Sequence, residues 1–149
     1  MKVNPYLNFD GTCREAFEFY KDVLGGEIVM ITTYGDMPPP EEGSEMEENC
    51  GGMPIAGDVA DRLAHVRLVF GDGAVLMGSD CPPGMASQER STSVALQVTS
   101  AAEGERIFNA LAEGGNVFML YAQTFWAERF GMAVDRFGVP WMVNFENQS

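Results

Sequence analysis

The sequence predicts an α+β fold in which two βαβββ modules form a single domain, residues 1–149. An internal repeat carries this prediction, because residues 15–30 align with residues 104–119 and place two Gly-Gly pairs in register. In each copy an amphipathic helix pattern precedes the glycines, an apolar strand pattern follows them, and a hairpin pattern closes the module. A chain of 149 residues is also an ordinary length for one domain.

The two predicted helices have matching faces, starts and ends. Their apolar residues recur at helical spacing: Ala16, Phe19, Tyr20, Val23 and Leu24 in the first copy, and Ile107, Phe108, Leu111 and Ala112 in the second. Thr12 with Glu15, and Ser100 with Glu103, have the spacing of a capping box, in which a hydroxyl and a carboxylate satisfy free N–H groups of the first turn. The glycine pair after each helix predicts the left-handed turn that ends it.

Short alternating segments predict the strands around these helices. A strand precedes each helix and two more form each closing hairpin, at 3–9, 64–70 and 74–78 in the first copy and at 92–98, 131–135 and 141–145 in the second. We therefore place module one at about residues 1–80, a linker at 81–90 and module two at about 91–146. The copies differ by an irregular insertion at 36–61, which is rich in Pro and Glu.

The charge and the cysteine content exclude several classes of function. A net charge of −13 repels phosphate backbones and anionic lipid, so we expect no nucleic-acid partner and no membrane partner. Cys13, Cys50 and Cys81 are odd in number and lack CxxC spacing, which indicates a reduced, cytoplasmic protein without a disulfide framework. Six acidic residues lie between positions 36 and 48 with no Lys or Arg among them. This stretch is either a solvated loop or a rim that attracts a cationic ligand.

Several short segments follow one another along nearly the whole chain: Pro5-Tyr-Leu-Asn-Phe9, Phe19-Tyr20 before Leu24-Gly25, Tyr34-Gly-Asp-Met-Pro38, Ala64-His65, Gly78-Ser79-Asp80, Thr124-Phe-Trp-Ala127, Phe130-Gly131 and Asp135-Arg-Phe-Gly-Val-Pro-Trp141. In this order they resemble the PhnB-like branch of the glyoxalase/bleomycin-resistance superfamily, also called the vicinal oxygen chelate superfamily. The resemblance implies that each module forms a curved mixed sheet, that the sheets enclose a concave pocket, and that the protein is a homodimer.

The resemblance also indicates where a metal ion would bind. Metal-using members of the superfamily hold a divalent ion with about four His, Glu or Gln side chains, near the start of the first strand and on the last strand of each module. The repeat places these positions near Asn4/Pro5, Met77/Ser79, Ser93/Val94 and Met142/Asn144, and none of them is His, Glu or Asp. His65 is the only histidine, which excludes a site with two histidines. We therefore expect no metal and no other cofactor, and we find no Gly-rich nucleotide loop in the sequence.

Strand alternation predicts which side chains point away from the helices and could line a pocket. The ligand-binding candidates are Tyr6, Asn8, His65, Arg67, Met77, Ser93, Gln97, Gln123, Phe125, Trp126, Phe130, Met142 and Asn144. The same face could instead be wet or contact a second subunit, the aromatic residues could belong to the core, and His65 could be a structural histidine. No catalytic residue is identifiable, because no nucleophile stands beside a recognisable base.

These observations leave three hypotheses for the function. The first is a small-molecule-binding protein without a superfamily-type metal site, which takes a modest-sized aromatic or cationic ligand. The alternative is a metal-dependent lyase, isomerase or dioxygenase, which would need atypical ligands such as His65 with Asp80 or Glu128. The third is a module that serves only in assembly. Because one fold hosts unrelated reactions, the sequence does not identify the ligand or the pathway.

Overall fold

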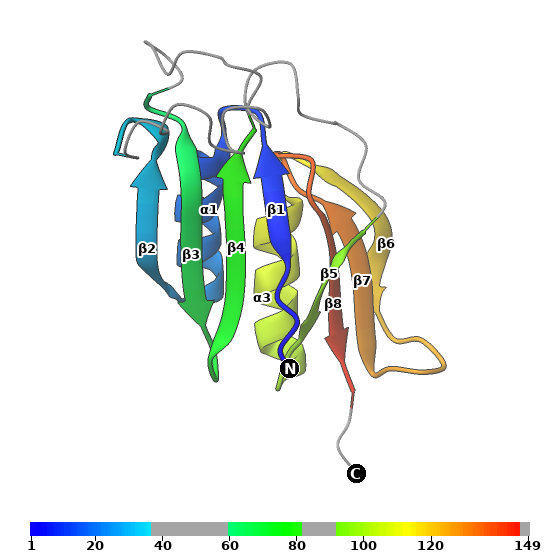
Figure 1. Cartoon of the computed structure of the whole chain (residues 1–149). Helices are drawn as coiled ribbons and strands as arrows, with labels where there is room; N and C mark the ends of the chain where they lie inside the picture. The colour runs from blue at the N-terminus through cyan, green and yellow to red at the C-terminus, as the bar shows by residue number, and fades with distance from the viewer. Residues whose placement is uncertain (37–59, 82–91, 147–149) are drawn as a thin grey trace. The chain divides into compact units, whose positions relative to one another are not determined.

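A computed structural model describes residues 1–36, 60–81 and 92–146, and the chain divides into two compact units, Met1–Ala86 and Ser87–Ser149. Each unit is a four-stranded mixed sheet with one α-helix packed on one of its faces (Figure 1). The predicted α+β fold of two βαβββ modules is therefore confirmed. The boundary between the units falls in the segment predicted as a linker, 81–90, and residues 82–91 lie outside the described part of the chain.

The first unit follows the order β-α-β-β-β. Its elements are β1 (Tyr6–Phe9), α1 (Cys13–Leu24), β2 (Glu27–Thr33), the 3-10 turn η1 (Tyr34–Asp36), β3 (Leu63–Phe70) and β4 (Ala74–Asp80). The sheet order is β1-β4-β3-β2, with β1 parallel to β4 and the other neighbours antiparallel. The strand β3, which carries His65 and Arg67, is therefore an interior strand with a neighbour on each side.

The helix α1 packs one apolar face onto this sheet. Its buried residues are Cys13, Ala16, Phe17, Tyr20 and Val23. Phe19 and Leu24, which share the apolar spacing, are only half-buried. The helix instead turns Phe17 toward the sheet, where its ring lies edge-on to the ring of Phe9 at 6.2 Å between centroids. Gly25 ends the helix with a φ of 68°, the left-handed turn that the glycine pair predicted.

The first turn of α1 is held by Asp80 rather than by the predicted capping box. Thr12 makes no side-chain cap bond. The buried Asp80 carboxylate instead accepts the backbone N–H groups of Gly11 and Cys13 on Oδ1, at 2.8 and 3.0 Å, and that of Leu63 on Oδ2, at 2.9 Å. A carboxylate in this place also interacts favourably with the positive end of the helix dipole. Asp80 thus joins the starts of α1 and β3 to the end of β4.

The second unit repeats the topology of the first. Its elements are β5 (Val94–Gln97), α3 (Ala101–Ala112), β6 (Asn116–Ala122), β7 (Arg129–Val134) and β8 (Pro140–Phe145), and the sheet order is β5-β8-β7-β6. Ile107, Phe108 and Leu111 of α3 are buried, as their spacing predicted, whereas Ala112 is only half-buried.

The start of α3 is capped by its own sequence. The Ser100 hydroxyl accepts the N–H of Glu103 at 3.1 Å, so the prediction of Ser100 as the cap is confirmed. In a capping box the Glu103 carboxylate would in turn accept the backbone N–H of Ser100. Here it accepts a hydrogen bond from the Thr99 hydroxyl instead, also at 3.1 Å. Gly114 follows the helix with a φ of 78°, as the second glycine pair predicted.

The loop between β7 and β8 is organised by a second buried carboxylate, that of Asp135. Its Oδ1 accepts the N–H groups of Phe137 and Val139 at 2.8 and 3.0 Å, and its Oδ2 accepts the indole N–H of Trp141 at 2.8 Å. Trp141 is itself buried beneath α3. The segment from Asp135 to Trp141, which contributed to the family resemblance, therefore has a structural function here.

The strand boundaries differ from their predicted ranges mainly at the start of each unit. The strand predicted at 3–9 is confined to Tyr6–Phe9, and Val3 is 90% exposed instead of packing against the helix. Likewise, β5 is shorter than the predicted 92–98. The acidic insertion begins in η1 at Asp36, whose N–H donates to the Thr33 hydroxyl at 3.2 Å, and residues 37–59 lie outside the described part. Neither helix of the described ranges is long and apolar enough to span a membrane.

Candidate functional site: the helix-free faces of the two sheets

Each sheet has one face covered by its helix and an opposite face, which we call the helix-free face, that carries most of the candidate residues. In unit one the register places four side chains in one row across β1, β4, β3 and β2: Tyr6, Met77, Arg67 and Met30. Asn8 pairs with Ser79 in the next row. Val66 and Leu68 alternate with these positions on β3 and are fully buried on the helix side. The helix-free face of unit one is therefore a polar surface interrupted by methionines.

Tyr6 and His65 contact each other on this face. Their rings are stacked at 5.9 Å between centroids with an interplanar angle of 28°. The Tyr6 hydroxyl lies 3.4 Å from His65 Nδ1. In the tautomer that carries its hydrogen on Nε2, His65 accepts from Tyr6 and keeps Nε2–H available as a donor. The pair thus combines an aromatic surface with a hydrogen-bond donor.

Arg67 lies between two methionines at the middle of the same face. Its register partners are Met77 on β4 and Met30 on β2. The side chain is exposed, and within the described ranges it makes no ion pair and no hydrogen bond. By contrast, Arg62 forms an ion pair with Asp10 at 2.7 Å. Among the described residues, nothing compensates the charge of the Arg67 guanidinium, which is a strong donor for oxyanions.

The equivalent row of unit two is almost entirely apolar. Ala95, Met142, Met132 and Met119 lie side by side across β5, β8, β7 and β6. Met132 thus occupies the place that Arg67 has in unit one. Methionine side chains are flexible and polarisable, so this row forms a floor that can adapt to different apolar ligands.

The next row of unit two contains an unsatisfied acceptor. Asn144 pairs with Gln97 on one side and with Phe130 on the other. Its Nδ2 donates to Gln97 Oε1 at 2.7 Å and to Glu146 Oε1 at 3.0 Å, which assigns the orientation of the amide. Its Oδ1 is buried and has no partner among the residues that the structure describes. A bound N–H or O–H group would satisfy this oxygen.

The turn between β6 and β7, residues 124–127, borders this surface, and we call it the aromatic turn. Ala127 N–H donates to the Thr124 hydroxyl oxygen at 3.1 Å, and Thr124 N–H donates to the Ala127 carbonyl at 3.1 Å, which closes the turn. Phe125, at its tip, is 96% exposed, and Trp126 is 47% exposed. The Trp126 ring lies edge-on to Phe125 at 4.7 Å and to Phe130 at 5.5 Å between centroids. The turn therefore holds two exposed aromatic rings in defined positions.

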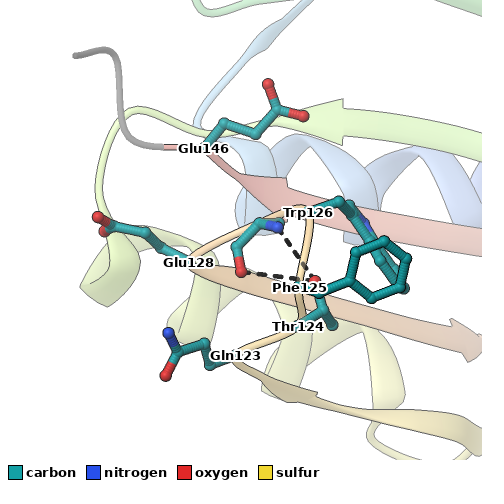
Figure 2. Close-up of a pocket in the computed structure, with 7 residues that line it drawn as sticks. Gln123, Thr124, Phe125, Trp126, Glu128 and Glu146 are labelled. Atoms are coloured by element: carbon teal, nitrogen blue, oxygen red, sulfur yellow. Dashed lines mark hydrogen bonds between the residues drawn. The ribbon is translucent and has the colours of Figure 1, made fainter.

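An open pocket of about 360 Å³ adjoins the turn. Its lining consists of the turn with its neighbours Gln123 and Glu128, and of Glu146, which directly follows β8. Figure 2 shows the rings of Phe125 and Trp126 on one side of the pocket, with the carboxylates of Glu128 and Glu146 directed away from them. The carboxylates therefore do not converge on one point, as a site for a bound cation would require.

The structure brings some of the predicted site residues together and separates others. Tyr6, Asn8, His65, Arg67 and Met77 share the helix-free face of unit one, whereas Gln97, Phe130, Met142, Asn144 and the aromatic turn with Gln123 belong to unit two. Ser93 precedes β5 and is half-buried. Their function in ligand binding stays a prediction. Met30 was not found from the sequence, and Met119 and Met132 could have belonged to a binding surface or to the core; the cross-strand register places all three on the helix-free faces.

The residues named for an atypical metal site do not form one. Asp80 is buried, and its two oxygens already accept three backbone N–H groups that hold the fold together. Glu128 belongs to unit two, at the aromatic turn. Within residues 1–36, 60–81 and 92–146, no three His, Cys, Asp or Glu side chains gather closely enough to hold a metal ion. Burial raises the pKa of the Cys13 thiol well above its usual range, and the nearby Asp80 charge adds to the effect, so this thiol is a poor nucleophile.

Comparisons with known proteins agree with the fold. The family model of the glyoxalase/bleomycin resistance protein/dioxygenase superfamily matches residues 2–143. Protein YjdN of Escherichia coli K12 is 38% identical over 148 residues, which cover 99% of this chain and 97% of YjdN. The crystal structure of PA1353 from Pseudomonas aeruginosa has a TM-score of 0.80 at 44% identity and covers 98% of both chains.

A PhnB protein from Bacillus cereus shares the fold at lower identity. Its TM-score is 0.72 at 21% identity, and the alignment covers 97% of this chain and 99% of that one. The resemblance to PhnB-like proteins that the short sequence segments indicated is thus confirmed. With the family model matching nearly the whole length and YjdN more than one-third identical throughout, the chain belongs to the glyoxalase/bleomycin resistance protein/dioxygenase superfamily.

Proposed function

We propose that this chain is a small-molecule-binding protein that takes its ligand on the helix-free faces of its sheets and needs no superfamily-type metal site. The observation that carries the proposal is the buried Oδ1 of Asn144, which has no partner among the described residues. Buried polar atoms in folded proteins are nearly always paired, so this unpaired acceptor suits a ligand N–H or O–H group that displaces the side chains covering it. A homodimer in a reducing compartment is part of the same proposal.

The surroundings of Asn144 favour a ligand with an aromatic or other apolar part. Met132 and Met142 supply thioether surface beside it. Phe130 pairs with Asn144 across the strands and contacts Trp126 at 5.5 Å between ring centroids. Small-molecule sites commonly combine such apolar walls with a few polar groups that orient the ligand.

The proposal is tested by fluorescence titration with benzamide, which combines an aromatic ring with an N–H donor. Both tryptophans lie in unit two, but Trp126 is half-exposed at the pocket and Trp141 is buried. We expect benzamide to change the emission of Trp126 saturably. The variant Trp126→Phe keeps an aromatic ring and should abolish the signal, because Trp141 lies away from the pocket.

A matched pair of variants tests the acceptor. Asn144→Leu removes the unpaired oxygen, and we expect it to raise the Kd for benzamide roughly tenfold, which corresponds to about 1.4 kcal/mol. Asn116→Leu makes the same change at the exposed start of β6 and should leave the Kd within about twofold of wild type. If benzamide gives no saturable response, or if the two variants bind it equally, the proposed function is wrong.

A further inference from the structure

We infer that the helix-free face of unit one is a binding site for a small organic or inorganic oxyanion, a carboxylate or a phosphate, with Arg67 as its central contact. The inference rests on the proposed function, because it assigns a ligand chemistry to one of the two faces proposed to bind small molecules. It differs from the cationic ligand that the acidic insertion suggested, because it rests on Arg67, and residues 37–59 of that insertion lie outside the described part of the chain.

The first argument is the local charge. The chain has 22 acidic and 9 basic residues, so an arginine would be expected to find a carboxylate easily. Arg67 nevertheless makes no ion pair within the described ranges. Glu27, which pairs with Val69 two residues further along β3, is the carboxylate placed toward the same face, and it does not reach Arg67. No carboxylate of residues 1–36, 60–81 and 92–146 thus pairs with this guanidinium, although the protein is strongly acidic.

The second argument is the surface around the guanidinium. Met30 and Met77 flank Arg67 across the strands, and Val69 follows it on the same face of β3. The two thioether side chains border the guanidinium with apolar surface, against which the apolar part of an organic oxyanion could pack while its charge makes a charge-assisted hydrogen bond. Arginine also offers a planar fork of N–H groups that matches a carboxylate or a phosphate with two parallel bonds.

The third argument is a second set of donors on the same face. His65 precedes Arg67 by two residues on β3 and stacks on Tyr6, whose hydroxyl lies 3.4 Å from Nδ1. In the tautomer in which Nδ1 accepts from Tyr6, His65 Nε2–H remains as a donor. The Tyr6 ring adds an aromatic surface on which an aromatic carboxylate can stack.

The repeat supplies the variant for the test. Met132 occupies in unit two the position that Arg67 has in unit one, between Met142 and Met119. Arg67→Met therefore introduces a residue that the same strand position of this fold already accommodates. The matched control is Arg14→Met, which changes the net charge equally on the exposed side of α1.

The only histidine of the chain gives a single-residue readout. We would follow the imidazole signal of His65 by NMR in the full chain during titration with sodium benzoate, inorganic phosphate and benzyltrimethylammonium chloride at constant ionic strength. We expect benzoate or phosphate to shift the signal saturably and benzyltrimethylammonium to leave it unchanged. Benzoate alone would assign an aromatic carboxylate, and phosphate alone would assign a phosphate. Arg67→Met should weaken the response at least tenfold, and Arg14→Met by less than twofold.

The outcomes separate this inference from the proposed function. A benzamide response at Trp126 without any anion response at His65 overturns the anion site and leaves the proposed function standing. An anion response that is equal in Arg67→Met and wild type, or a response only to the cation, also overturns it. If Arg67→Met does not fold, Arg67→Gln, which is polar and of similar length, carries the same comparison.

Discussion

Replacing Asp80 with Asn should destabilise unit one far more than the same change at its neighbour Asp10. In the wild type, Asp80 Oδ1 accepts two backbone N–H groups and Oδ2 accepts a third, from Leu63. In Asp80→Asn the amide oxygen can still accept the N–H groups of Gly11 and Cys13, but the NH₂ group faces the Leu63 N–H. At least one charge-assisted hydrogen bond is therefore lost, and one buried donor is left unpaired. Each of these effects is worth about 1.5–3 kcal/mol, and because they overlap we expect a total of about 2–4 kcal/mol.

The Asp10→Asn variant is the control. Asp10 forms an ion pair with Arg62, but its side chain is 56% exposed, and such surface pairs contribute about 0–1 kcal/mol. The assay is urea unfolding followed by far-UV circular dichroism, with amide hydrogen exchange of Val66 and Leu68 to report on unit one. Tryptophan fluorescence does not serve here, since both tryptophans belong to unit two. If Asp80→Asn lost no more free energy of unfolding than Asp10→Asn, the assignment of Asp80 as the structural centre of this corner would be wrong.

Three further predictions follow from buried groups. Asp135→Asn should lower the free energy of unfolding by about 2–4 kcal/mol, because Asp135 also accepts three hydrogen bonds. The measurement is urea unfolding followed by tryptophan fluorescence, and a loss below about 1 kcal/mol would contradict the prediction. Gly104→Ala should lower the free energy of unfolding by about 1–3 kcal/mol although alanine favours helices, because the added Cβ would collide with the Tyr121 hydroxyl. Adding Tyr121→Phe to this variant should recover part of the loss in the same assay. Burial raises the pKa of the folded Cys13 thiol above its unfolded value of about 9, so its contribution to stability is complete below pH 9 and is lost above it, with a slope approaching about 1.4 kcal/mol per pH unit. Unfolding measured between pH 8 and pH 10 should show this added slope in the wild type and not in Cys13→Ala.

The parts of the fold that could be predicted are those with local signals. The apolar spacing of the helices, the Ser100 cap and the glycine turns each depend on residues within a few positions of one another. They can therefore be predicted from the sequence alone. The cap of α1 could not be predicted, because Asp80 lies 69 and 67 residues from the Gly11 and Cys13 amides that it binds. Thr12 stands at a capping position in the sequence, but a non-local carboxylate takes its place.

The candidate site could be predicted only in part for a related reason. Alternation assigns Tyr6, His65 and Arg67 to the helix-free face, because each strand alone defines its two faces. Which residue lies beside Arg67 depends on register, and β2 contains register shifts between Ile28 and Met30 and again near its end. Met77 was predicted for this face, but the position of Met30 beside the guanidinium became visible only in the structure.

The central claim is that this chain binds a small molecule on a helix-free face without the aid of a metal ion. The most direct test is the benzamide titration of the wild-type chain, followed by Trp126 emission before and after exhaustive dialysis against EDTA. We predict the same saturable response and the same Kd in both samples, because Asn144 and the aromatic turn supply the binding surface. A response that disappears after chelation and returns with added Mn²⁺ or Zn²⁺ would contradict the claim.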